Sequence, residues 1–171
     1  MPLRPVLSFA LCAGTVAAAV SEWTLARRGR RDTGRAAAAI NAPSHWLWGE
    51  EAIRRDGLDL RHTAVGTAVH WASALLWSTA FAVLRARRRA PGPGNAIIDA
   101  AAVAAVAAWV DLRVVPCRFT PGFERRLSGK SLLLVYAGFA AGLAAAELAR
   151  GARPRHDARS CSRAAPRRCR G

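Results

Sequence analysis

The sequence predicts an all-α fold: a polytopic helical membrane bundle of about four transmembrane helices plus one interfacial or re-entrant segment. About half of the 171 residues are apolar (52%), yet 26 Lys and Arg stand against 11 Asp and Glu, for a net charge of +15. The charges are segregated from the apolar residues, since long uncharged blocks alternate with short arginine-rich ones. This alternation is expected of a chain that passes repeatedly between lipid and water.

The four predicted spans lie in a single helical domain over residues 1–149, at residues 5–25, 62–84, 95–115 and 131–148. Each block approaches the roughly 20 residues needed to cross the hydrocarbon core. The first block ends at Trp23, where an indole favours the headgroup region, and is followed by a run of arginines. Because its apolar run continues past the small residues at 17–19, a retained anchor is favoured over a cleaved signal peptide.

The third block contains two aspartates, Asp99 and Asp111. Each would cost about 2.5–3.5 kcal/mol near the centre of a spanning helix. Their spacing of twelve residues corresponds to about 18 Å of helix, so they can lie towards opposite ends of one span. Two interpretations are open: each aspartate pairs with a nearby arginine, as Asp111 with Arg113, or both line a proton or cation path together with His70.

Residues 36–49 form an apolar segment that is too short to span comfortably and is interrupted by a proline. It suits an interfacial or re-entrant helix, and the alternative is a fifth, kinked span. The tryptophans at 46 and 48 argue against disorder in this long connection. We expect the segment to be ordered, to lie at the membrane interface next to the loop at 117–128, and to cap the bundle near His62 and Asp111.

Three of the four histidines, His45, His62 and His70, are concentrated in one region. The simplest interpretation is an interfacial belt of aromatic and polar side chains. His70, however, lies inside the second predicted span, where an imidazole is a candidate functional group. It could hydrogen-bond to an aspartate or ligate a metal or haem. His62 and His70 are about 12 Å apart along a helix, too far to share one metal ion, so neither a metal site nor a cofactor is predicted.

Small residues recur at helical spacing and predict close helix packing. The candidate positions are Gly14, Gly66, Gly138 and Gly142. Gly138 and Gly142 are four residues apart, which places them on one face of a helix. That face would suit contact with a neighbouring helix, a second copy of the chain or another membrane protein.

The tail at 150–171 is rich in arginine and contains almost no large apolar residue, which predicts disorder. It has no aromatic platform for stacking bases, so the lipid bilayer is the expected partner and nucleic acid is not. The four cysteines include no C-x-x-C pair, and the sequence does not support a zinc site or a disulfide framework.

Two sequence blocks carry a resemblance: N-A-x-S-H-W-L-W-G at residues 41–49 and P-G-F-E-x-x-L-S at residues 121–128. Together with Arg61-His62-Thr63 and His70, they resemble a family of uncharacterised proteobacterial four-span membrane proteins, over most of residues 10–147. The resemblance implies a multi-pass protein of the bacterial inner membrane and brings no established activity. We therefore expect a structural or accessory membrane protein that is not an enzyme, with a small permease or proton-conducting protein as the alternative and a haem- or metal-binding redox protein as the second alternative.

Overall fold

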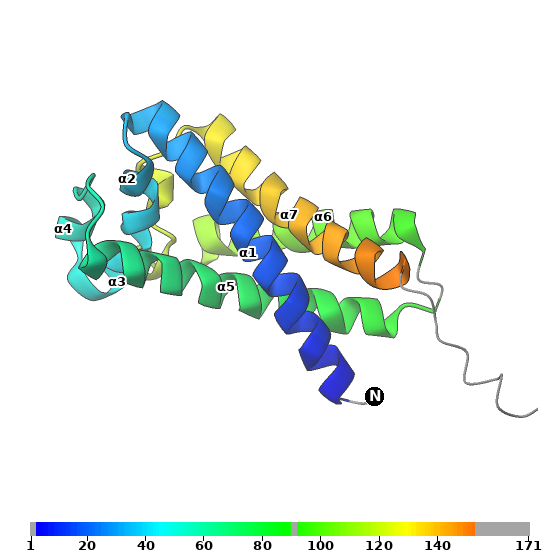
Figure 1. Cartoon of the computed structure of the whole chain (residues 1–171). Helices are drawn as coiled ribbons and strands as arrows, with labels where there is room; N and C mark the ends of the chain where they lie inside the picture. The colour runs from blue at the N-terminus through cyan, green and yellow to red at the C-terminus, as the bar shows by residue number, and fades with distance from the viewer. Residues whose placement is uncertain (1–2, 90–91, 153–171) are drawn as a thin grey trace, which may run out of the picture.

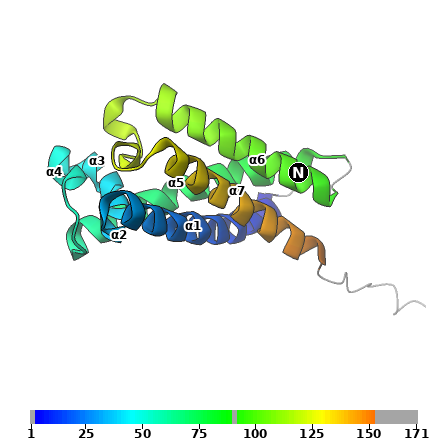
Figure 2. The same ribbon diagram turned by 90° about the horizontal axis from the view of Figure 1, so that it is seen from above.

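The computed structural model describes residues 3–89 and 92–152, and this part of the chain is helical throughout, without strands. Four long helices run side by side as a bundle (Figures 1 and 2). They are α1 (Leu3–Thr33), α5 (Leu60–Arg87), α6 (Pro93–Trp109) and α7 (Gly129–Ala152). The predicted all-helical fold is confirmed.

Three of these helices, α1, α5 and α7, are long and apolar enough to cross a membrane. Helix α6 has 17 residues and runs into a single π-helical turn, η2 (Val110–Val114), in which the N–H of Val115 donates to the carbonyl of Val110 at 3.0 Å. The continuous fourth helix predicted at 95–115 is therefore interrupted near its end. A multi-pass membrane protein is plausible, with three spans supported by length and composition.

Two helices extend beyond the spans predicted for them. Helix α1 continues through the arginines after Trp23 to Thr33, because arginine favours a helix even where it takes the chain out of lipid. Helix α7 likewise runs to Ala152, two residues into the predicted tail. The rest of that tail, residues 153–171, lies outside the described residues.

Between α1 and α5 the chain folds into four short helices: α2 (Ala36–Asn41), η1 (Ala42–Ser44), α3 (His45–Trp48) and α4 (Glu50–Ile53). None exceeds six residues, so none could cross a membrane. They pack across one end of the bundle against α1 and α5 (Figure 1). We call residues 36–53 the cap. The loop after α6, with the short helices η3 (Cys117–Phe119) and η4 (Phe123–Arg125), lies beside it.

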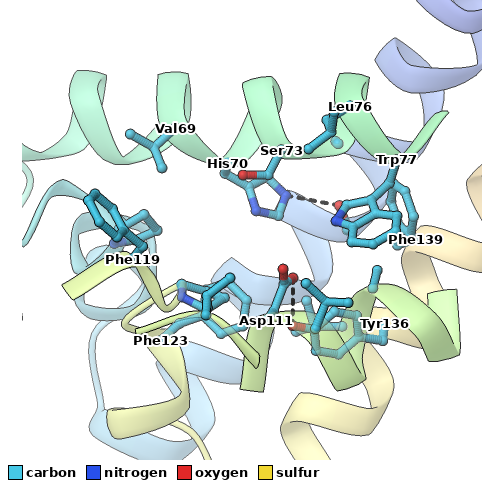
Figure 3. A pocket seen from close by; sticks show the side chains of 18 of the residues that line it. Val69, His70, Ser73, Leu76, Trp77, Asp111, Phe119, Phe123, Tyr136 and Phe139 are labelled. Carbon is cyan, nitrogen blue, oxygen red and sulfur yellow. Dashed lines mark hydrogen bonds between the residues drawn. The ribbon is translucent and has the colours of Figure 1, made fainter. Parts of the chain in front are cut away.

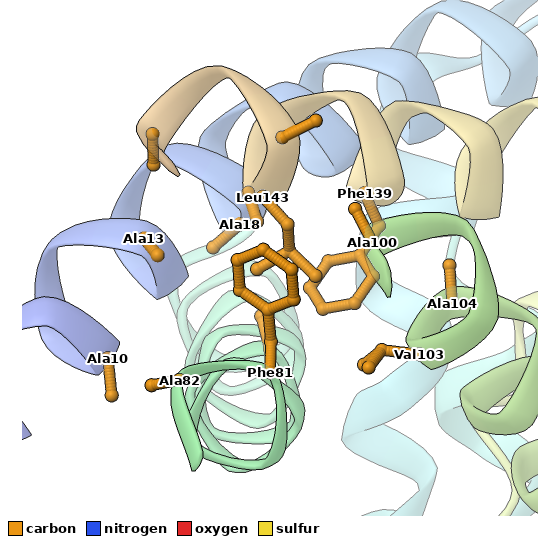
Figure 4. Packing of buried hydrophobic residues seen from close by; sticks show 14 of the residues in the cluster. Ala10, Ala13, Ala18, Phe81, Ala82, Ala100, Val103, Ala104, Phe139 and Leu143 are labelled. Atoms are coloured by element: carbon orange, nitrogen blue, oxygen red, sulfur yellow. The ribbon is translucent and has the colours of Figure 1, made fainter. Parts of the chain in front are cut away.

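Small side chains allow the long helices to approach closely. The main core packs the aromatic rings of Phe81 and Phe139 and the side chain of Leu143 against alanines of α1 and α6 (Figure 4). A second core lies under the cap and joins Leu25 of α1 to Phe123 of the loop after α6. The main core and this second core lie towards different ends of the bundle.

Glycine permits two of the closest approaches. A Cβ at Gly66 of α5 would lie 2.0 Å from the carbonyl oxygen of Ile40, so only glycine lets the cap lie against α5 at this point. A Cβ at Gly142 of α7 would lie 2.5 Å from Cα of Ala17 in α1. Both distances are far below van der Waals contact, and these positions fix how the cap and α7 are seated.

The other two glycines also lie at helix contacts within the chain. Gly14 of α1 faces Ser78 of α5, and Gly138 of α7 faces Thr24 of α1. The face of α7 that carries Gly138 and Gly142 is therefore covered by α1. A homodimer stays a prediction, but it would need a different surface.

Candidate functional site

A cavity of about 230 Å³ lies under the cap, between α5, α6 and α7. Its walls are mostly apolar, and the aromatic residues among them are Trp46, Trp77, Phe119, Phe123, Tyr136 and Phe139. Two ionisable side chains enter it from opposite walls, His70 from α5 and Asp111 from η2 (Figure 3). The cavity thus combines an apolar lining with two polar groups that face each other.

His70 presents a hydrogen-bond acceptor to this cavity. Its Nε2 lies 2.9 Å from Oγ of Ser21 in α1, and that hydroxyl donates its single hydrogen to the carbonyl of Ala18 at 3.1 Å. In a neutral imidazole, Nε2 must then be the donor, which leaves Nδ1 as the acceptor. In the described part of the chain, the side-chain hydrogen bond of the His70 ring is at Nε2, and the ring also bonds to the backbone carbonyl of Ala18.

Asp111 accepts a hydrogen bond from the hydroxyl of Tyr136 in α7 at 3.1 Å, and the indole of Trp77 in α5 also bonds to it. The pairing with Arg113 that the sequence suggested is absent, because Arg113 is exposed and no ion pair joins the two in the described structure. The π turn carries Asp111 at the point where α6 ends. Single π turns recur at functional sites.

Two further carboxylates belong to this region, and sequence reasoning did not single them out. Glu22 of α1 accepts hydrogen bonds from Thr67 at 2.6 Å and from the indole of Trp71 at 2.7 Å. Glu124 has one carboxylate oxygen that is buried without a partner, and it lies close enough to Asp111 to interact with it electrostatically. The available signal for Glu22 was its place at the edge of an apolar block next to a tryptophan.

The other described carboxylates all have an arginine or histidine nitrogen at 3.9 Å or less, and the histidine, His62 beside Asp59, is a cation only when it is protonated. These carboxylates are Asp32, Glu50, Glu51, Asp56, Asp59, Asp99 and Glu147. Within the described part of this arginine-rich chain, carboxylates without an ion pair therefore occur at the cavity end alone, as Glu22, Asp111 and Glu124.

Asp99 lies at the opposite end of the bundle. It accepts from Arg85 at 2.9 Å and also pairs with Arg88, while Arg85 bonds to Glu147 at 3.1 Å. Arg85, Asp99 and Glu147 are all buried, and they tie α5, α6 and α7 together. The structure thus brings His70 and Asp111 to one cavity and places Asp99 elsewhere, in the arginine pairing that was the simpler interpretation.

His45 and His62 belong to the cap and its junction with α5. His45 Nδ1 lies 2.9 Å from the carbonyl of Ala42, and His62 Nδ1 lies 2.9 Å from Asp59. In the described structure, both Nε2 atoms are buried without a partner, and neither ring lines the cavity. Both histidines help to fix the cap.

The predicted contact between the cap and the loop after α6 is confirmed. The indole of Trp46 donates to the carbonyl of Thr120 at 2.8 Å and meets the ring of Phe119 edge-on at 5.6 Å. This contact closes the cavity on the cap side, because Trp46 and Phe119 both line it.

The described residues contain no group of three or more His, Cys, Asp or Glu side chains placed to hold a metal ion. No family model, curated protein or solved structure matches the chain. The resemblance carried by residues 41–49 and 121–128 remains an expectation.

Proposed function

We propose that this chain is a four-span protein of the bacterial inner membrane with an accessory, non-enzymatic role, and that it binds a small, mostly apolar molecule in the cavity under the cap. One observation carries the proposal: His70 and Asp111 enter an aromatic cavity of about 230 Å³ from opposite walls. Small-molecule sites typically combine a mainly apolar lining with a few placed polar groups.

The outer surface of α6 supports a fourth span. Its 17 residues and the five of η2 together extend about 30 Å, which matches the hydrocarbon thickness. Ile97, Ile98 and Val106 are 56%, 62% and 50% exposed on this helix. Large apolar side chains in such positions suit contact with lipid. Four spans place both termini on the same side, together with the arginines at 85–89, which favours the cytoplasm for that side.

Reporter fusions test this topology. We expect fusions after Arg35, Asp59 and Gly122 to report one side of the membrane, and fusions after Gly94 and Pro154 to report the other. Opposite signals at Arg35 and Asp59 would mean that residues 36–49 cross the membrane, and equal signals at Gly94 and Gly122 would remove α6 as a span.

Filling the cavity tests the binding role. Val110 lines the cavity, and Val106 lies on the outer face of α6. Val110→Trp should abolish binding of phenylalkanes and phenylalkylamines, measured by saturation-transfer NMR on the purified protein in detergent. Val106→Trp, the same substitution on the outer face, should leave binding unchanged. If the protein bound no member of this set, or if both variants bound like the wild type, the proposed role would be wrong.

A small permease or proton-conducting protein is the second candidate, because His70 and Asp111 share a cavity. The structure supports a proton or cation path less than the sequence did. Asp99, the third residue of that path, is held in ion pairs at the opposite end of the bundle. Proteoliposomes with a pH-sensitive dye separate the two roles. A proton leak that Asp111→Asn removes would favour conduction, and equal leak from both proteins would exclude it.

A further inference from the structure

At the cavity end, carboxylates have no ion-pair partner. Elsewhere in the described chain, each carboxylate has one. We propose that its ligand is an organic ammonium ion, a protonated amine on an apolar body, whose N–H groups lie between Asp111 and Nδ1 of His70. This inference rests on the proposed binding role and names the class of ligand. It follows from three independent features of the site: an unpaired carboxylate, an acceptor on the opposite wall and aromatic walls.

The first feature is the carboxylate of Asp111. An ionised carboxylate in an apolar setting is expensive unless a cation or several hydrogen bonds compensate it. Asp111 accepts hydrogen bonds from Tyr136, at 3.1 Å, and from Trp77, but it has no arginine partner in the described structure. The nearby carboxylate of Glu124, with one buried oxygen unpartnered, makes this wall more negative. A bound cation would supply the missing partner.

The second feature is the opposite wall. In the neutral tautomer described above, His70 Nδ1 is an acceptor, and Glu22 lies close enough to His70 to act on it electrostatically. Two acceptors that face each other, at Asp111 and His70, favour a ligand that donates on both sides. A protonated amine carries such donors together with the positive charge. A carboxylate or phosphate ligand would instead meet the charge of Asp111.

The third feature is the lining between these walls. Trp77, Phe119 and Phe123 present aromatic surface to the cavity (Figure 3). Aromatic faces attract organic cations and also bury the apolar body that such ions carry. A bare metal ion would need several oxygen ligands, and the described residues hold no group of three candidate ligands. The lining therefore selects an organic cation over an inorganic one.

Pairs of ligands that differ only in their positive charge test whether the cavity recognises an ammonium group. Phenylalkylammonium ions with two to six methylenes have neutral isosteres, the phenylalkanes in which a methyl group replaces the ammonium. We expect the ammonium ions to bind the purified full chain at least about tenfold more tightly than their isosteres at neutral pH. Asp111→Asn should erase this preference and leave the affinity for phenylalkanes nearly unchanged. The control Asp56→Asn removes the same charge from an exposed carboxylate outside the cavity and should change neither affinity.

Glu124→Gln provides a second variant, because it leaves the contact between Asp111 and Tyr136 in place. It should lower the affinity for the ammonium ions by a smaller factor, about two- to fivefold. Equal affinity for ammonium ions and phenylalkanes in the wild type would overturn the ammonium inference and leave the binding role standing. No binding of either set would overturn both. A preference that survives Asp111→Asn would also overturn the inference, because the charge would then be recognised elsewhere.

Discussion

The two ends of the bundle treat buried charge in opposite ways. At the end where α5 meets α6, Arg85 lies between Asp99 and Glu147, and all three are buried. At the cavity end, Asp111 enters a mostly apolar space in which Tyr136 and Trp77, both uncharged, are its hydrogen-bond donors. The first arrangement holds three helices together, and the second leaves bonding capacity open to a ligand.

The difference does not come from a shortage of cations. Arg113 and Arg118 follow Asp111 closely in the sequence, yet both are exposed and neither pairs with it. At Asp99, where the ion pairs stabilise the helix packing, two arginines bond to one carboxylate. An unpaired carboxylate in a chain of net charge +15 is therefore best explained by a role in binding.

Arg85→Met should have the largest effect. It would leave Asp99 and Glu147 facing each other without the buried cation between them, and breaking such a pair typically costs about 3–5 kcal/mol. We expect a large fall in the Tm of the purified protein in mild detergent. Arg87→Met, an exposed neighbour on the same helix, is the control and should change little. If both variants unfolded at the wild-type temperature, the ion cluster would not hold the helices together.

Gly66→Ala should follow in size and would act at the cavity end. Its new Cβ would lie 2.0 Å from the carbonyl of Ile40, so the cap must move away from α5, at about 1–3 kcal/mol for an overpacked contact. Labelling of a cysteine at Ser44 reads this movement. Ser44 is fully buried, and Ser44→Cys should react slowly alone and rapidly with Gly66→Ala.

The control for the cap is Gly57→Ala, because a Cβ there meets nothing within 4 Å. It should leave the labelling of Ser44→Cys slow, whereas Asp56→Cys on the exposed side should react rapidly in every background. Rapid labelling at both cysteine positions in the wild type would show that the cap is a mobile loop.

Asp111→Asn should raise the Tm slightly, by an amount equivalent to about 0.5–2 kcal/mol. The substitution removes a carboxylate without an ion pair from a mostly apolar cavity and keeps an oxygen for Tyr136. A stabilising change that also removes the preference for ammonium ligands is the pattern expected of a functional group. If the variant fell in Tm as far as Arg85→Met, Asp111 would be a structural residue, and the two ends would be alike.

The smallest effect concerns the start of α5. Asp59 caps this helix and accepts the backbone N–H of His62 at 2.7 Å, and this bond lowers the pKa of the Asp59 carboxyl. A lowered pKa means that the stabilisation is present above the pKa of the unfolded group, about 3.9, and is lost as the pH falls below it. Asp59→Ala should therefore lower the Tm modestly at pH 7, and the difference from the wild type should shrink as the pH falls through the lowered pKa of Asp59.

The sequence was sufficient to predict where the helices lie along the chain, but not which side chains meet between them. Charge-free blocks predict α1, α5 and α7, because the cost of burying charge in lipid acts on every residue of a span. The sequence did not predict the π turn at 110–114, within which Asp111 contacts Tyr136 of α7. The ordered cap was predictable, since its tryptophans required burial or an interface.

The site was predictable only in part for the same reason. His70 and Asp111 were singled out because polar groups within apolar blocks are rare. The separation of Asp99 from Asp111 follows from their spacing of twelve residues. The arginine that pairs with Asp99 was not predictable, because Arg85, Arg87, Arg88 and Arg89 look alike in the sequence. Glu124 was hidden in a charged loop, where burial of one oxygen leaves no trace in composition.

The π turn at the end of α6 also makes the position of Asp111 easy to change. An α-helix turns by about 100° per residue, and a π turn rotates the chain less at each step. Insertion or deletion of a single residue at 110–114 would therefore swing the carboxylate to a different neighbour, while the contacts of α6 from Asp99 to Ala107 would keep their phase. Related chains could shift this charge between lipid, α7 and the cavity by a one-residue change in length.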